Sequence, residues 1–213
     1  MGGAELKFVG QHKDLGVLVS SSLKFHAHID SVVRKASGLA SSLLRSTVCR
    51  EQSFMVSLFI SHIRPIMDYC SVLWNLGYLG DVRRMESVQR RWTRQIEGMV
   101  GLDYGMRLER LGLYSVAGRH LRADLIKVWK LFHREDRELF VGLFDRRSHA
   151  STRGHEFKLA VPRSRTDIKH RFFSSRVVSV WNGLPEVAVL AGSVDGFKKC
   201  LVECCRELFY RVL

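Results

Sequence analysis

The chain has 213 residues, and its hydrophobic content of 46% excludes a disordered tail and allows one large or two small cores. It carries 34 lysine and arginine residues against 21 acidic residues, so the formal net charge is +13 at pH 7. An excess of this size favours a polyanionic partner, with nucleic acid first and an anionic membrane surface second. The alternatives are a generic basic protein and a fragment whose acidic half is missing.

The N-terminus and the cysteines point to a cellular location. Residues 1–7 carry charges and lack the apolar stretch of a secretory signal. The five cysteines include no CxxC pair, so we expect reduced thiols. No apolar run approaches the ~20 residues of a membrane span. These features predict an intracellular protein, nuclear or cytoplasmic, that is not secreted and has no membrane partner.

In chain order, the first predicted elements are a β-hairpin and a helix. Residues 5–25 predict strand, turn and strand, with Leu6 and Phe8 in the first strand and the break at residues 11–14. From Phe25 onward the apolar residues recur at helical spacing, which predicts an amphipathic helix that reaches about residue 44.

The next segment is predicted to be helical up to a proline. A second helix is expected over about residues 51–62. It should stop near Arg64, because Pro65 disfavours helical geometry in the residue before it. Residues 66–79, rich in Tyr, Trp and Gly, are expected to form a short packed segment and a loop.

A helix that begins at Asp81 carries the clearest charge pattern. It is predicted to reach about Glu97, with Gly98 as its stop signal. At about 100° per residue, one third of its circumference holds five arginines, here called the Arg row: Arg83, Arg84, Arg90, Arg91 and Arg94. Five apolar residues fall on the opposite side: Val82, Met85, Val88, Trp92 and Ile96.

The Arg row is a candidate phosphate-binding surface. Successive helical turns place guanidinium groups in a line that can follow a nucleic-acid backbone. The alternative is a solvated charged face, which is the usual meaning of a charged stripe. Glu86 and Glu97 lie near the edge of the row, and we expect them to neutralise it in part.

The remaining chain is predicted to be mostly helical. Expected elements are a short helix at 107–111, a longer one at 115–133, a strand at 157–161 and two final helices at about 170–182 and 193–210. Together the elements predict a mainly α fold: a helical bundle plus a helical C-terminal region, with a short N-terminal β-hairpin.

Residues 153–176 form a second basic segment, with seven cations against two acids and thus 7 − 2 = +5. A basic loop can adapt its shape to phosphates, whereas the alternative is a solubilising surface loop. The adjacent Phe172 and Phe173 are expected to pack in a core rather than to stack on bases. The candidate contacts in this segment are Arg163, Arg165, Lys169, Arg171 and Arg176.

Signatures of catalysis are missing from the sequence. It contains no HExxH, GxSxG or P-loop motif and no paired zinc-ligand spacing. Its acidic residues are isolated, whereas a two-metal polymerase or nuclease needs clustered carboxylates. We therefore predict no catalytic residue, no metal, no cofactor and no small-molecule substrate.

Five segments in a fixed order resemble the C-terminal portion of reverse transcriptases from non-LTR (LINE-type) retrotransposons of the jockey and chicken-repeat kind. The resemblance covers most of the chain, and five motifs in the same order make it specific. The matching segments are K-D-L-G-V with L-K-F and H-I (13–29), R-P-I-M-D-Y-C-S-V-L-W (64–74), M-E-S-V-Q-R-R-W-T-R (85–94), Y-G-M-R-L-E-R-L-G-L (104–113) and F-F-S-S-R-V-V-S-V-W-N-G-L-P (172–185).

The resemblance implies a residual palm β-hairpin over 1–25, a thumb-like helical domain over 26–100 and a helical C-terminal region over 101–213. Nothing in the chain matches the family's Phe/Tyr-Ala-Asp-Asp turn or its upstream palm aspartate. It thus implies a truncated RNA-directed DNA polymerase that is not an enzyme on its own.

The family's thumb holds the duplex of RNA template and DNA primer. The resemblance therefore implies that the Arg row faces RNA or DNA. The alternative function is a helical protein-interaction module with no nucleic-acid role.

Overall fold

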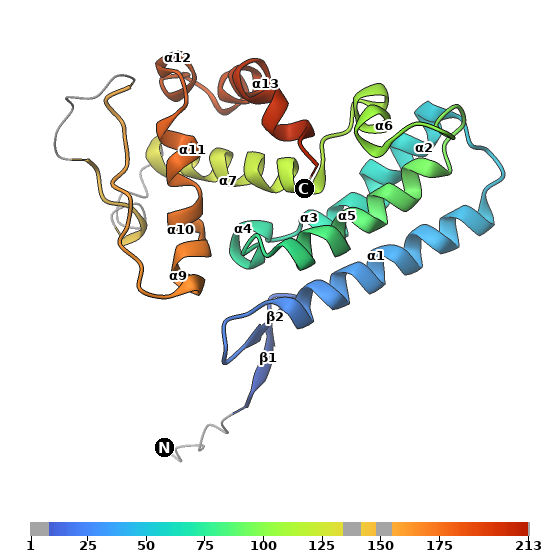
Figure 1. Cartoon of the computed structure of the whole chain (residues 1–213), viewed down its shortest axis with the longest axis horizontal. Helices are drawn as coiled ribbons and strands as arrows, with labels where there is room; N and C mark the ends of the chain where they lie inside the picture. Colours follow the sequence, from blue (N-terminus) through green and yellow to red (C-terminus); the bar gives the residue numbers. More distant parts are fainter. Residues whose placement is uncertain (1–8, 134–141, 148–154, 213) are drawn as a thin grey trace, which may run out of the picture.

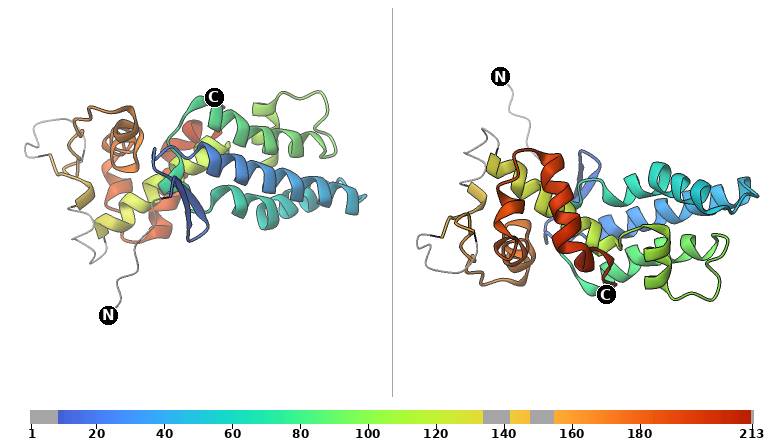
Figure 2. Two further views of the ribbon diagram at one scale, coloured as in Figure 1. Left: turned by 90° about the horizontal axis from the view of Figure 1, so that it is seen from below. Right: turned by 90° about the horizontal axis from the view of Figure 1, so that it is seen from above.

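The computed structural model describes residues 9–133, 142–147 and 155–212. The fold is mainly α-helical with an antiparallel two-stranded hairpin near the N-terminus, as predicted. Helices from the first half of the chain lie at one end of an elongated molecule and the C-terminal helices at the other, with α7 (Val116–His133) running between them (Figure 1, Figure 2). None of the described helices has the length and apolarity that crossing a bilayer requires.

The hairpin pairs β1 (Gln11–Asp14) with β2 (Val17–Ser20), and Gln11 lies opposite Ser20. The turn is Leu15–Gly16, whose φ angles of 42° and 89° are those of a two-residue hairpin turn. The predicted break at residues 11–14 is therefore wrong. All four β1 residues are exposed, so this strand lacks the apolar alternation by which strands are recognised. Leu6 and Phe8 lie outside the described residues.

Two long helices form the frame of the first half. The first, α1 (His26–Ser46), confirms the predicted amphipathic helix. It packs alongside α5 (Leu79–Arg94), which begins two residues before the predicted start and ends three residues before the predicted end (Figure 1). Asp81 lies in the first turn of α5, as expected for an acid near the positive end of a helix dipole.

The helix before Pro65 does not stop there. Helix α2 (Gln52–Leu58) continues through a π-helical turn (Phe59–Ile63) into α3 (Arg64–Asp68), so the predicted end near Arg64 is wrong. Pro65 lies in the first turn of α3, where its missing N–H matters least. The π turn widens the helix just before the proline, which relieves the clash that a proline makes with the preceding turn.

The first hydrophobic cluster lies between α1, α5 and the α2–α3 run. Its largest fully buried side chains include Trp74 of the short helix α4 (Ser71–Trp74) and Trp92 of α5. The indole nitrogens of both donate to backbone oxygens, Trp74 to Tyr69 at 2.7 Å and Trp92 to Met55 at 3.1 Å. Helix α6 (Tyr104–Leu111) packs on α5 next to this cluster.

The C-terminal part is built from short helices and one long one. The single helix predicted at about 170–182 is instead α9 (Asp167–Arg171), α10 (Phe173–Arg176) and α11 (Val178–Asn182). Phe172 is extended, with ψ at 154°, and it separates α9 from α10. After α12 (Glu186–Val189) the chain ends with α13 (Val194–Tyr210), close to the predicted bounds.

A second hydrophobic cluster fills the space between α7, α11 and α13. Phe173 and Trp181 are buried in it, so Phe173 is a core residue, as predicted. On α13 the buried residues are Phe197, Leu201, Cys205 and Phe209. The strand predicted at 157–161 is wrong, because only a single bridge joins Leu159 to Arg146 there.

Candidate nucleic-acid interface

Helix α5 has the two faces that its sequence predicts. Val82, Met85, Val88, Trp92 and Ile96 are all buried. Four members of the Arg row are exposed on the other face: Arg83, Arg90, Arg91 and Arg94. Among the residues that the structure describes, no carboxylate forms an ion pair with any of these four. Their charges are therefore available to a ligand.

Arg84, the fifth member of the row, joins α5 to α1. Its guanidinium forms ion pairs with Asp30 of α1 and with Asp81 one turn earlier on α5. Asp81 also lies 2.7 Å from Nδ1 of His26, so the start of α5 is held against the start of α1. The hydrogen bond to Asp81 raises the pKa of Arg84 further above its already high value. The main role of Arg84 is thus to connect α5 to α1 through ion pairs.

Glu86 forms no ion pair with the Arg row, so the expected neutralisation is wrong for this residue, whereas Glu97 is exposed as expected of a surface acid. Its side chain is buried and accepts hydrogen bonds from the Tyr104 hydroxyl, from the Val116 N–H at 2.6 Å and from the Ala117 N–H at 3.3 Å. Those two amides begin α7, where unpaired N–H groups and the helix dipole favour a negative charge. Glu86 is a cap for α7 supplied by α5.

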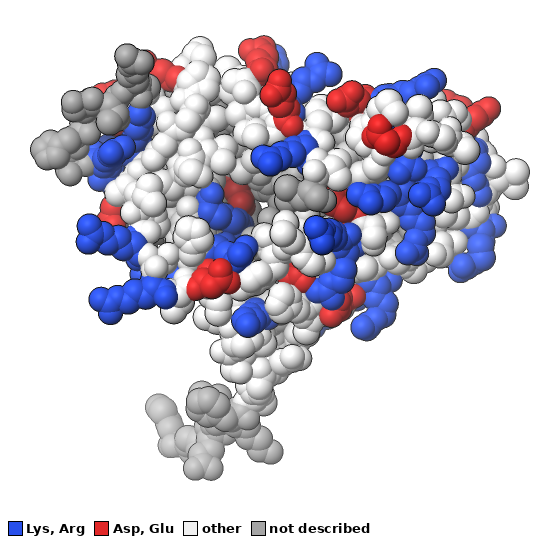
Figure 3. Space-filling view, in the orientation of Figure 1, with Lys and Arg blue, Asp and Glu red and all other residues white. Residues whose placement is uncertain are grey.

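Helix α6 brings further arginines beside the row. The guanidinium carbon of Arg90 lies 4.8 Å from the Tyr104 ring centroid, and that of Arg107 lies 5.6 Å from it. Arg107 is only 3% exposed, and burial together with neighbouring Arg94 lowers its pKa. Arg110 is exposed on the same short helix. Figure 3 shows lysine and arginine side chains gathered over the end of the molecule where α5, α6 and α1 lie.

Sequence reasoning missed Arg107 and Arg110 as parts of a basic surface. Both occur in the Y-G-M-R-L-E-R-L segment, but their closeness to the Arg row depends on how α6 folds back onto α5. Spacing along the chain carries no information about that packing. The one sequence signal is the Asp103 N-cap and the Gly112 stop, which fix the bounds of α6.

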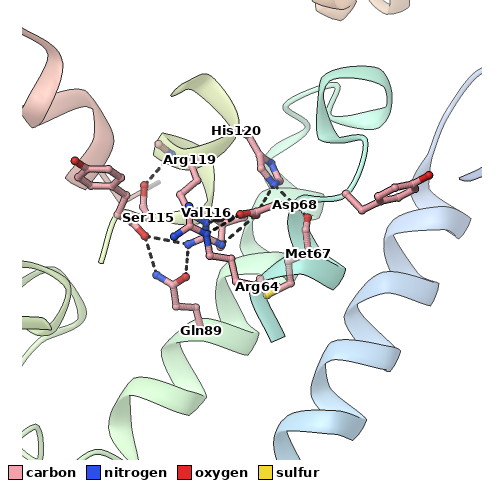
Figure 4. A network of polar contacts seen from close by, with 12 residues as sticks. Arg64, Met67, Asp68, Gln89, Ser115, Val116, Arg119 and His120 are labelled. Carbon is pink, nitrogen blue, oxygen red and sulfur yellow. Dashed lines mark hydrogen bonds and ion pairs between the residues drawn. The ribbon is translucent and has the colours of Figure 1, made fainter. Parts of the chain in front are cut away.

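A polar network joins α3, α5 and α7 behind the interface (Figure 4). The Asp68 carboxylate accepts from Arg119 Nε at 2.9 Å and from Arg64 Nε at 3.1 Å, and His120 Nε2 lies 3.4 Å from it. Gln89 accepts from Arg119 and donates to the Tyr114 carbonyl at 2.9 Å. Burial alone would raise the pKa of Asp68, but the hydrogen bonds from His120 and Arg119 hold it well below its ordinary value.

Residues of separate sequence motifs meet at this network. The ring of Trp74 lies edge-on to both His120 and His28, with centroids 5.2 and 5.4 Å apart. Asp68 and Trp74 come from the segment over 64–74, and Gln89 comes from the segment over 85–94. The contacts give these residues a role in holding helices together, behind the exposed cations.

The second basic segment is divided between exposed and engaged cations. Arg171 pairs with Asp167 at 2.8 Å and lies 4.5 Å from the centroid of the Tyr78 ring. Arg176 makes two 2.8 Å contacts to Asp124 and donates to the Val72 carbonyl at 2.9 Å. Both arginines therefore tie the C-terminal helices to the rest of the molecule. Exposed cations in this segment are Arg163, Arg165 and Lys169, whereas Arg153 lies outside the described residues.

No protein-family model, curated protein or solved structure matches this chain.

Among the described residues, no metal site accompanies the basic surface. The described part of the chain holds no group of three or more His, Cys, Asp or Glu side chains placed to bind a metal ion. A groove of about 530 Å³ lies between the hairpin, α1 and α3, and Lys13, His28, Lys35 and Tyr69 contribute to its walls. It lies at the opposite end of α1 from the α5–α6 contact.

Proposed function

We propose that this chain is the thumb and C-terminal portion of a non-LTR retrotransposon reverse transcriptase and that it binds the duplex of RNA template and DNA primer. The observation that carries the binding proposal is the exposed part of the Arg row: four arginines on one face of one helix that form no ion pair with any described carboxylate. The ordered sequence motifs support the family. An intracellular location, nuclear or cytoplasmic, belongs to the same proposal because template RNA is found there.

The dimensions of the surface suit a nucleic-acid backbone. Arg83 and Arg94 are eleven residues apart, so the row extends over about 16 Å at about 1.5 Å per residue. That length corresponds to about five base steps at roughly 3.4 Å per step along one strand. Arginine is suited to the task because its planar guanidinium binds phosphate oxygens in pairs.

Arg163, Arg165 and Lys169 form a secondary set of exposed cations in this proposal. Arg84, Arg171 and Arg176 are left out of the contact surface, because the ion pairs described above already engage them. The proposal includes no polymerase activity for these residues, so a primer-extension assay with the purified chain is expected to give no product.

Removing the four exposed charges tests the proposal. Glutamine at Arg83, Arg90, Arg91 and Arg94 is expected to lower the affinity for a labelled RNA–DNA hybrid by about a hundredfold or more at low salt. The slope of log affinity against log salt should fall by about three to four, since each phosphate contact contributes about 0.9. Fluorescence anisotropy at several salt concentrations measures both quantities.

A matched variant separates this effect from net charge. Glutamine at Lys127, Lys130, Lys198 and Lys199 removes the same number of charges from α7 and α13. It is expected to change the affinity by less than about tenfold, because those lysines lie away from α5. Absence of hybrid binding by the unmodified chain at low salt would overturn the nucleic-acid role and favour a protein-interaction module instead.

A further inference from the structure

A buried arginine without an acceptor lies between α5 and α6. Arg107 is 3% exposed, and its Nε atom is buried with no hydrogen-bond partner. The structure gives its guanidinium no hydrogen bond or ion pair with any described residue. Arginine stays protonated in proteins, so this is a buried positive charge that forms no ion pair with a described carboxylate, although the charge of Asp103 acts favourably on it.

Two further arginines approach the same place. Arg90 shares the Tyr104 ring with Arg107, and the charges of Arg94 and Arg90 both act unfavourably on Arg107. Like charges repel, and the cost rises when one of them is withdrawn from water. An anion that binds among the three guanidiniums lowers the free-energy cost of their mutual repulsion.

The carboxylates nearby are already engaged as helix caps. Asp103 accepts from the Met106 N–H at 3.0 Å and caps α6. Glu86 accepts from the first amides of α7 and from the Tyr104 hydroxyl. Neither carboxylate forms an ion pair with Arg90, Arg94 or Arg107. The hydrogen bond to Glu86 therefore holds the Tyr104 hydroxyl in place, and the guanidiniums of Arg90 and Arg107 both lie near the Tyr104 ring.

We propose that Arg90, Arg94 and Arg107 form a site for one phosphate group in the contact between α5 and α6. Guanidinium groups provide paired N–H donors that match phosphate oxygens. The ligand is a backbone phosphate of the bound nucleic acid, and this choice rests on the proposed function. A free phosphate ion carries the same chemistry, so the test includes both sources.

The first arm of the test uses inorganic phosphate alone. Thermal unfolding is measured in sodium phosphate and in sodium chloride at the same ionic strength, for the unmodified chain, for Arg107→Met and for Lys130→Met, which removes an exposed charge of α7. Phosphate is expected to raise the Tm of the unmodified chain and of Lys130→Met, because a ligand that binds the folded state stabilises it. Arg107→Met should lose the difference between the two salts.

Arg107→Met also reports on the fold directly. Methionine fills a similar space without the buried charge, so the variant should be at least as stable as the unmodified chain in chloride. If Arg107→Met is unfolded in both salts, Arg94→Met replaces it in the comparison of Tm values. The Arg94 side chain is exposed, so its removal should not disturb the core. The loss of the phosphate-dependent shift in Tm is expected there as well.

The second arm uses the labelled RNA–DNA hybrid. Arg107→Met is expected to weaken binding about tenfold and to reduce the salt slope by about one, as for the loss of one phosphate contact. If the phosphate-dependent Tm shift is equal in the unmodified chain and Arg107→Met, the site is overturned even if the hybrid binds through the rest of the Arg row. If the shift depends on Arg107 but the hybrid does not bind, the nucleic-acid source is overturned and free phosphate is the ligand.

Discussion

Gly118→Ala is expected to destabilise the protein by about 3 kcal/mol, although alanine normally stabilises a helix interior relative to glycine. A Cβ atom on Gly118 would lie 2.1 Å from the carbonyl oxygen of Phe209 and 2.5 Å from its Cα. These are backbone atoms of α13, so no side-chain rotation relieves the overlap. The same carbonyl accepts from the Ser115 N–H at 2.9 Å and the Ser115 hydroxyl at 3.2 Å, which holds it in place.

The control for Gly118→Ala is Gly38→Ala in α1. Gly38 is also inside a helix, but a Cβ there would meet no atom within 4 Å. It should stabilise the protein by about 0.5–1 kcal/mol through helix propensity alone. Circular dichroism during chemical unfolding measures both variants. A Gly118→Ala protein as stable as the unmodified chain would contradict the close contact between α7 and α13.

Asp68→Asn is the second change with a large expected effect, a loss of about 3 kcal/mol near neutral pH. The Arg119 side chain is only 4% exposed, and Asp68 is the carboxylate with which it forms an ion pair. Asparagine keeps the size of the side chain but leaves the buried guanidinium without a negative charge. Asp195→Asn is the matched control: Asp195 pairs with Lys198 at 2.8 Å but is 78% exposed, so solvent screens the pair and its loss should change stability much less than Asp68→Asn does.

The effect of Asp68→Asn should depend on pH in a defined direction. In the folded chain the pKa of Asp68 lies well below its ordinary value, so the unfolded chain takes up that proton at a higher pH. The stability that Asp68 contributes is therefore complete above about pH 4 and is lost as the pH falls below that value. Unfolding free energies of the two proteins should converge towards pH 2. A gap that stays constant from pH 7 to pH 2 would contradict this role for Asp68.

The bounds and faces of the long helices were predictable because each lies between a core and solvent. In α5 the burial of Val88 and Trp92 and the exposure of Arg90 follow directly from helical spacing. The hairpin register was not predictable in the same way, since β1 has no buried side. The passage of a helix through Pro65 depends on a local π turn, which apolar spacing does not signal.

The candidate site was only partly predictable, because several of its charges are paired across long distances in the chain. Arg84 and Arg176 look like free cations in the sequence, yet each forms an ion pair with an acid more than fifty residues away. Glu86 looks like a surface acid but binds amides thirty residues further along. Arg107 looks like an ordinary helical arginine. Each of these contacts depends on how the helices pack against one another. The sequence of one segment does not specify that packing.

The position of α7 limits how the molecule can be divided. Val116 belongs to the first hydrophobic cluster and Leu125 to the second, so one helix is part of both. A fragment that ended at residue 100 would keep the exposed arginines of α5 but would remove Arg119 from Asp68 and the α7 amides from Glu86. Two carboxylates would then be left without the groups that hold them. A fragment that carries the Arg row and keeps both contacts must therefore extend at least to Arg119 in α7.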